Sequence, residues 1–138
     1  RQTMRNLILG GLIALVALAG CGKKEFPQPD TSEPLRIVNL QWSKEVSVIT
    51  MKFTIVGGYG NVGYQIDRAV SDNVCNCLTG WQRFLEQETL PNRKGVEQMR
   101  NVMLSYKRDF AFRIRAIDSA GNLSPWSAPM QARADEPR

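Results

Sequence analysis

The sequence predicts an all-β fold, an antiparallel β-sandwich that occupies residues 35–134. Two observations indicate it. Apolar residues recur at every second position, most clearly over 46–56 and 110–117, which is the period of a half-buried strand. Turns rich in Gly, Asn, Asp and Pro separate about seven such runs within about 100 residues, a number and spacing typical of a sandwich.

The strands expected along the chain cover residues 35–42, 46–56, 63–70, 95–104, 110–117 and 127–133. The alternation predicts that Ile49, Met51, Phe53 and Ile55 face the core. It also places Tyr64, Ile66 and Arg68 on one face of their strand, and Phe110, Phe112, Ile114 and Ala116 on one face of theirs. The stretch 81–90 does not alternate cleanly, so it reads equally as one helical turn or as an irregular strand.

An apolar run with an unusual ending precedes the sandwich. Residues 7–19 are apolar or glycine, Arg5 supplies a positive charge before them, and Met4 is an alternative start. Such a run has the length of a signal-peptide core and is shorter than the roughly 20 residues that span a membrane. The sequence therefore predicts a signal helix over residues 1–20, with an uncleaved membrane anchor as the alternative.

Residues 18–21, Leu-Ala-Gly-Cys, resemble the lipobox of bacterial lipoproteins. The resemblance implies cleavage before Cys21, attachment of diacylglycerol to its thiol and acylation of the new amino terminus. Several chains on one residue would hold the protein at a membrane almost permanently. Gly22 after the cysteine resembles outer-membrane cargo, so the expected location is the bacterial cell envelope, at the outer membrane facing the periplasm or the cell surface.

Residues 21–34 are expected to form a disordered, proline-rich tether between the lipid and the sandwich, and residues 135–138 a disordered tail. Cleavage would remove Arg1 and Arg5 from the 18 basic residues, so 16 would remain against 13 acidic ones. That balance is ordinary, and no stretch carries five or more Lys or Arg in succession. A nucleic-acid partner is therefore not expected.

The sandwich region resembles a fibronectin type III domain. Residues 110–127, Phe-Ala-Phe-Arg-Ile-Arg-Ala-Ile-Asp-Ser-Ala-Gly-Asn-Leu-Ser-Pro-Trp-Ser, are similar to the last two strands of that family, and residues 63–68 to an earlier one. Leu104 occupies the place of the family's corner leucine. Phe110 stands where the family has a corner tyrosine, so a hydroxyl hydrogen bond is missing and the corner should be looser. The resemblance implies an immunoglobulin-like sandwich.

Enzymatic chemistry is not expected. The chain has no His, which removes the commonest general base and metal ligand, and neither a catalytic residue nor a cofactor or metal site is predicted. Residues 58–63 match Gly-x-Gly-x-x-Gly, but a strand follows rather than the helix that binds a pyrophosphate, so a hairpin loop is predicted. Asp118 and Asn122 flank a turn and are expected to fold it rather than bind calcium.

Cys75 and Cys77 are separated by one residue, and three interpretations compete. A local, structural disulfide is favoured, because an extended chain brings such residues near the required Cα separation. A metal site would need carboxylates such as Asp67 or Asp72. Free thiols, including pairing with another chain, come third. A redox activity of this pair is the enzymatic rival to the expectation that the protein is not an enzyme.

Candidate binding residues are Tyr59, Trp81, Arg113 and Arg115. Tyr59 lies at a loop tip, Trp81 is expected to be partly exposed, and the two arginines share a strand face that could bind an anion but more simply reads as solvated. Trp126 is expected in the core. Together these features predict a lipid-anchored, non-enzymatic module that binds an envelope protein or polysaccharide, or alternatively a structural subunit of a secretion or lipopolysaccharide-export assembly.

Overall fold

A computed structural model describes residues 33–71, 74, 75, 77–105 and 108–134. The predicted signal peptide, Cys21, most of the tether and the tail lie outside these residues. Seven strands form within the described part: β1 (Arg36–Glu45), β2 (Val48–Val56), β3 (Val62–Ser71), β4 (Leu78–Leu90), β5 (Glu97–Met103), β6 (Asp109–Asp118) and β7 (Met130–Arg133). No helix among the described residues is long and apolar enough to cross a membrane.

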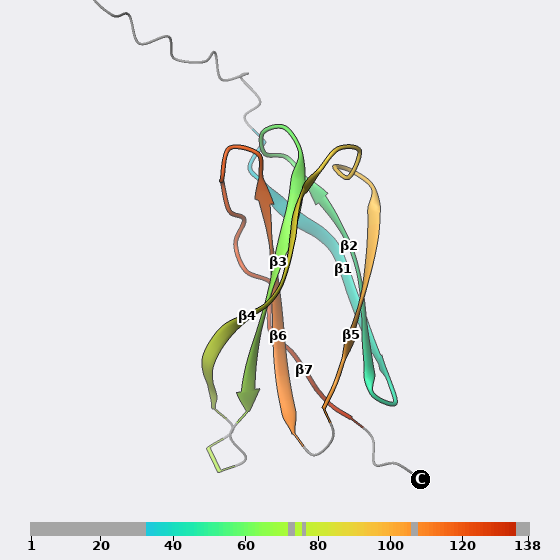
Figure 1. Ribbon diagram of the computed structural model, residues 1–138, viewed down its shortest axis with the longest axis vertical. Coiled ribbons are helices and arrows are strands. Elements are labelled where there is room, and N and C mark those ends of the chain that lie inside the picture. Colours follow the sequence, from blue (N-terminus) through green and yellow to red (C-terminus); the bar gives the residue numbers. More distant parts are fainter. Residues whose placement is uncertain (1–32, 72–73, 76, 106–107, 135–138) are drawn as a thin grey trace, which may run out of the picture.

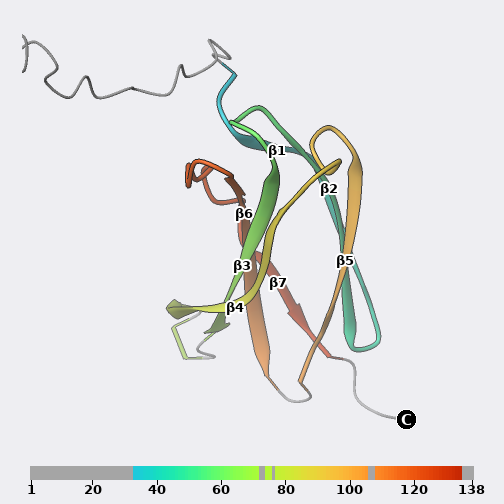
Figure 2. The ribbon, with the colours of Figure 1, turned by 45° about the horizontal axis from the view of Figure 1, so that its top comes forward.

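The strands form two antiparallel sheets that face each other, as Figures 1 and 2 show. The smaller sheet has the order β1-β2-β5, and the larger has the order β4-β3-β6-β7. All pairings between neighbouring strands are antiparallel. The predicted all-β sandwich is therefore confirmed.

The core lies between the sheets and contains the side chains that the alternation predicted. Ile49, Met51, Phe53 and Ile55 on β2 are fully buried, and so are alternate residues of β6. Phe53 meets Tyr64 of the opposite sheet edge to face, with ring centroids 5.0 Å apart. Burial of these rings is the main force that holds the sheets together.

The ambiguous stretch 81–90 belongs to a strand, β4, whose pairing with β3 is irregular. The register shifts at three points, and one shift sets Ala69 against the two residues between Thr79 and Gln82. Such bulges re-aim side chains and break the two-residue alternation. The two aromatic residues of this stretch consequently point to opposite faces. Phe84 packs on the core residue Phe112, with 5.6 Å between ring centroids, and Trp81 lies on the outer face beside Arg113.

The last predicted strand, 127–133, is shorter than expected. Only Met130–Arg133 pair as a strand, β7, and the preceding segment follows β6 by side-chain hydrogen bonds. The hydroxyl of Ser124 accepts from the N–H of Ala116 at 2.8 Å, and that of Ser127 accepts from the N–H of Ile114 at 3.0 Å. The serine N–H groups donate back to the carbonyls of the same two residues.

The N-terminal segment enters the sandwich at the end that carries the loops 57–61 and 91–96, at the top of Figure 1. The N–H of Gly58 donates to the carbonyl of Glu33 at 3.1 Å, and the Nζ of Lys94 donates to the carbonyl of Gly58 at 3.1 Å. The chain is thus fixed at this end before β1 begins, and β7 ends at the opposite end.

The glycine-rich stretch 58–63 leads into a strand, as predicted, but the predicted hairpin is wrong. The stretch connects β2 of the smaller sheet to β3 of the larger one, and these strands do not pair with each other. Asp118 holds this loop. One carboxylate oxygen of Asp118 accepts from the N–H of Tyr59 at 2.9 Å. Asp118 also accepts from the N–H groups of Ala120 and Asn122 and from the Asn122 side chain. Asp118 and Asn122 therefore fold the turn, as expected.

Burial alone would raise the pKa of the Asp118 carboxyl, but its hydrogen bonds from Tyr59, Asn122 and Ala120 outweigh that effect and lower the pKa. A lowered folded-state pKa contributes stability above the unfolded value of about 3.9, and this is lost as the pH falls through the folded value. We expect Asp118→Asn to flatten the acid-side loss of stability below about pH 4, measured by urea unfolding at several pH values. Asp109→Asn, at a more exposed carboxylate, is the control, and an unchanged acid slope in Asp118→Asn would contradict the assignment.

Candidate interaction face

Two rows of polar side chains cross the outer face of the larger sheet. In the first row, Asp67 of the central strand β3 is paired in register with Arg83 on β4 and with Arg113 on β6. Arg83 Nε donates to Asp67 Oδ1 at 2.8 Å, and Arg113 Nη2 donates to Oδ2 at 3.2 Å. The Asp67 side chain is only 8% exposed, so both of its oxygens are engaged by cations inside the sheet surface.

The second row lies beside the first and contains Glu86, Gln65 and Arg115 on the same three strands. Arg115 Nε donates to Gln65 Oε1 at 2.8 Å, and Gln65 Nε2 donates to Glu86 Oε1 at 3.1 Å. Arg83 Nη1 also reaches Glu86 Oε2 at 3.3 Å and links the rows. Cross-strand pairs of this kind stabilise a sheet and fix its register.

Two indole rings stack with the arginines of β6, in the order Trp81, Arg113, Trp126, Arg115; we call this the Trp–Arg ladder. The guanidinium carbon of Arg113 lies 4.4 Å from the Trp81 ring and 4.1 Å from the Trp126 ring. That of Arg115 lies 4.2 Å from Trp126. Each distance is well inside the roughly 6 Å at which a cation is attracted to a ring face.

Trp126 is half-buried on this outer face, so the expectation that it plugs the core is wrong. The serine hydrogen bonds explain its position. Ser124 and Ser127 both bind β6. They are three residues apart, whereas their partners Ala116 and Ile114 are two apart, so the segment has one extra residue against β6. Trp126 between them is thereby turned over Arg113 and Arg115.

The ladder and the two rows form one surface, which we call the ladder face. It carries three arginines and two carboxylates, Asp67 and Glu86. The Arg113 side chain is 25% exposed, and its buried Nε has no hydrogen-bond partner in the described part of the chain. The guanidinium is stabilised there by its contacts with the two indole rings. The face offers planar, pre-ordered cations and aromatic edges rather than a reactive group.

Of the four candidate binding residues, the structure brings Trp81, Arg113 and Arg115 together, and leaves Tyr59 44% exposed on the loop at the N-terminal end of the sandwich. Both arginines lie on the outer face of β6 and are partly exposed, and there they are also stacked on indoles and hydrogen-bonded. Sequence reasoning missed Gln65, Asp67, Arg83 and Glu86 as members of this face. The signal in the sequence was Asp67, a carboxylate within an apolar strand, because a buried carboxylate needs cationic partners.

Cys75 and Cys77 lie in an exposed connection between β3 and β4, with their sulfur atoms at disulfide-bonding distance and their Cα atoms 5.1 Å apart. The favoured local pairing is thereby confirmed. Asp67, considered as a metal ligand with these cysteines, is held by two arginines instead, and Asp72 lies outside the described residues. No group of three or more potential ligands gathers among the residues described.

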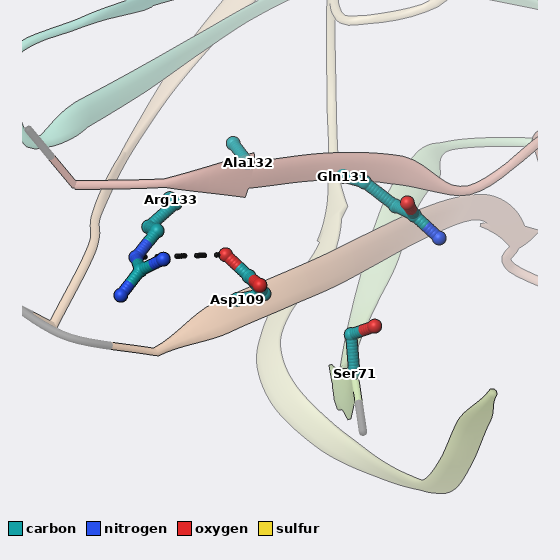
Figure 3. Close-up of a pocket in the computed structure, with 5 residues that line it drawn as sticks. All are labelled: Ser71, Asp109, Gln131, Ala132 and Arg133. Carbon is teal, nitrogen blue, oxygen red and sulfur yellow. Dashed lines mark ion pairs between the residues drawn. The ribbon is translucent and has the colours of Figure 1, made fainter. Parts of the chain in front are cut away.

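A shallow pocket of about 230 Å³ lies farther along the larger sheet, where β3 ends and β6 begins. Figure 3 shows the side chains that line it: Ser71, Asp109, Gln131, Ala132 and Arg133. Asp109 and Arg133 form an ion pair across it at 3.8 Å, and the Arg133 side chain is 57% exposed. This exposed pair is a convenient control for the ladder face, because it carries the same charges without aromatic support.

No family model matches the chain, and no curated protein matches it. Three chains of solved structures do. The chain is similar in fold to one that is described as "Myokine structure". The two are 16% identical, the TM-score is 0.51, and the match covers 75% of this chain and 100% of the other. At that identity the similarity shows the sandwich fold and nothing about a shared ligand.

Proposed function

We propose that this protein is a lipid-anchored, non-enzymatic interaction module of the bacterial cell envelope, with a fibronectin type III-like sandwich as its binding domain. The lipobox-like residues 18–21 support the anchor. The ladder face carries the binding part of the proposal. Tryptophan and arginine are the residues that contribute most at binding surfaces, and here they are held in place before any partner arrives.

The geometry of the sandwich gives the proposal an orientation. The chain that would lead back to Cys21 joins the sandwich beside the loop 57–61. That end would face the membrane, the exposed Cys75–Cys77 connection would lie at the far end, and the ladder face would stand at the side. A tethered side face meets partners at a raised effective concentration near the membrane without new contacts.

The anchor is tested by Cys21→Ser in the native host. We expect the unaltered protein to lack residues 1–20, to carry acyl mass on Cys21 and to sediment with membranes, because several buried acyl chains hold it there. The variant should lose the acyl mass and leave the membrane fraction. Cys77→Ser is the matched control and should stay anchored. An intact peptide upstream of Cys21 without acyl mass would overturn the proposal.

A structural subunit of a secretion or lipopolysaccharide-export assembly is the second candidate. Photo-crosslinking from position 81 in the native envelope separates the two, because a subunit would give one stoichiometric protein adduct and a binding module a substoichiometric or glycan adduct. Enzymatic redox chemistry at Cys75 and Cys77 is the third, and thiol titration of the oxidised and reduced protein tests it.

A further inference from the structure

We propose that the ladder face binds an acidic polysaccharide, a chain of sugars that carries carboxylate groups. This inference rests on the proposed function, since it names the class of ligand for the same face. The main observation behind it is that the three arginines of the ladder face have different hydrogen-bond partners. Arg83 and Arg113 both pair with Asp67, whereas Arg115 pairs with the neutral Gln65.

Arg115 is the cation whose charge the sheet leaves unbalanced. Its Nε donates to Gln65 Oε1 at 2.8 Å, but within the described residues it has no carboxylate partner, and its two terminal nitrogens have no hydrogen bond. The ladder face as a whole carries one more cation than anions. A guanidinium in this state is suited to a carboxylate, which accepts two parallel hydrogen bonds from it.

The guanidinium plane is also fixed in advance. The bond to Gln65 holds one edge of Arg115, and the Trp126 ring at 4.2 Å holds one face. An arginine that is already ordered loses little side-chain entropy when it binds, so more of the interaction appears as affinity. A ligand carboxylate would therefore bind Arg115 with higher affinity than it would bind a mobile surface arginine.

The second row favours a sugar over a polymer that carries carboxylates alone. Glu86, whose side chain is 51% exposed, offers oxygen acceptors on the same line as Arg115. A sugar carboxylate can accept from Arg115 while its hydroxyl groups donate to Glu86. Glu86 repels the carboxylate of either ligand, but an acidic peptide side chain has no hydroxyl to donate to Glu86 and so cannot offset this repulsion. The half-buried indoles add apolar edges that can contact sugar C–H groups.

The test is a calorimetric titration of the full-length protein in uncharged detergent micelles with polygalacturonate. We expect saturable binding that Arg115→Gln weakens at least tenfold. Arg133→Gln removes the same charge from an exposed position of the same sheet and should weaken binding less than twofold. Poly-L-glutamate and neutral dextran of matched length should each bind at least tenfold more weakly than polygalacturonate.

Arg115→Lys separates a binding role from a packing role. It keeps the charge but not the planar fork, so affinity should fall by an intermediate factor while tryptophan fluorescence and the unfolding midpoint stay near those of the unaltered protein. Equal losses in Arg115→Gln and Arg133→Gln, equal binding of poly-L-glutamate, or no binding of polygalacturonate would each refute the inference. A protein that is anchored through Cys21 but ignores polygalacturonate refutes this inference alone, whereas one without an anchor refutes the proposed function.

Discussion

Replacing Phe53 by alanine is expected to lower the free energy of unfolding by about 3–5 kcal/mol, the range for truncating a large buried aromatic side chain. Phe53 is fully buried in β2, the central strand of the smaller sheet, and its ring meets Tyr64 of the larger sheet at 5.0 Å. The pair is a bridge between the layers. Alanine would remove the bridge and leave a cavity that two hydrogen-bonded sheets cannot close.

Chemical denaturation monitored by circular dichroism measures this effect. Phe53→Leu is the control, because it keeps most of the apolar volume and should cost less than half as much as alanine. Phe112 of the larger sheet is also fully buried, so the cost of Phe112→Ala can be compared with that of Phe53→Ala. A loss below about 1 kcal/mol for Phe53→Ala would mean that the two sheets do not share one tightly packed core.

The sequence predicted β2 and β6 correctly because both strands are regular and one face of each carries most of the buried apolar side chains. In β2, Ile49, Met51, Phe53 and Ile55 alternate with polar or less buried residues, so the pattern directly records which side meets the core. In a regular strand, the local alternation of apolar and polar residues is enough to predict which side chains face the core.

β4 and the segment before β7 could not be predicted in the same way. The orientation of Trp81 depends on register shifts against β3. That of Trp126 depends on two serines that bind β6 through both their hydroxyl and their N–H groups. Both are properties of a contact between distant segments. The sequence therefore placed Trp81 at a partly exposed site and Trp126 in the core, and it did not show that arginines would stack on both rings.

The ladder face was half predictable for a related reason. Arg113 and Arg115 stood out because they share one face of an alternating strand, but their partners come from β3 and β4. Asp67 sits in a strand that is buried along most of its length, where a lone carboxylate is costly. Such a residue predicts cationic partners on adjacent strands, although it does not say which ones.

Asp67 is consequently the residue on which the ladder face depends most. We expect Asp67→Asn to lower the free energy of unfolding by about 2 kcal/mol, because it removes the counter-ion of Arg113 and leaves Arg83 only its longer contact with Glu86. The cost should lie below the roughly 3–5 kcal/mol of a fully buried pair, since both arginines are partly exposed. Loss of the row should also loosen Arg113 between its two indoles.

Urea denaturation measures the stability, and tryptophan fluorescence reports the ladder independently. If Asp67 holds Arg113 in place, the emission of Trp81 and Trp126 should shift to longer wavelength in the folded Asp67→Asn protein, since both rings would gain contact with water. Asp109→Asn removes the same charge beside an exposed arginine and should change neither quantity by much. A destabilised Asp67→Asn protein with unshifted emission would show that the aromatic stacking, rather than the central carboxylate, positions the arginines.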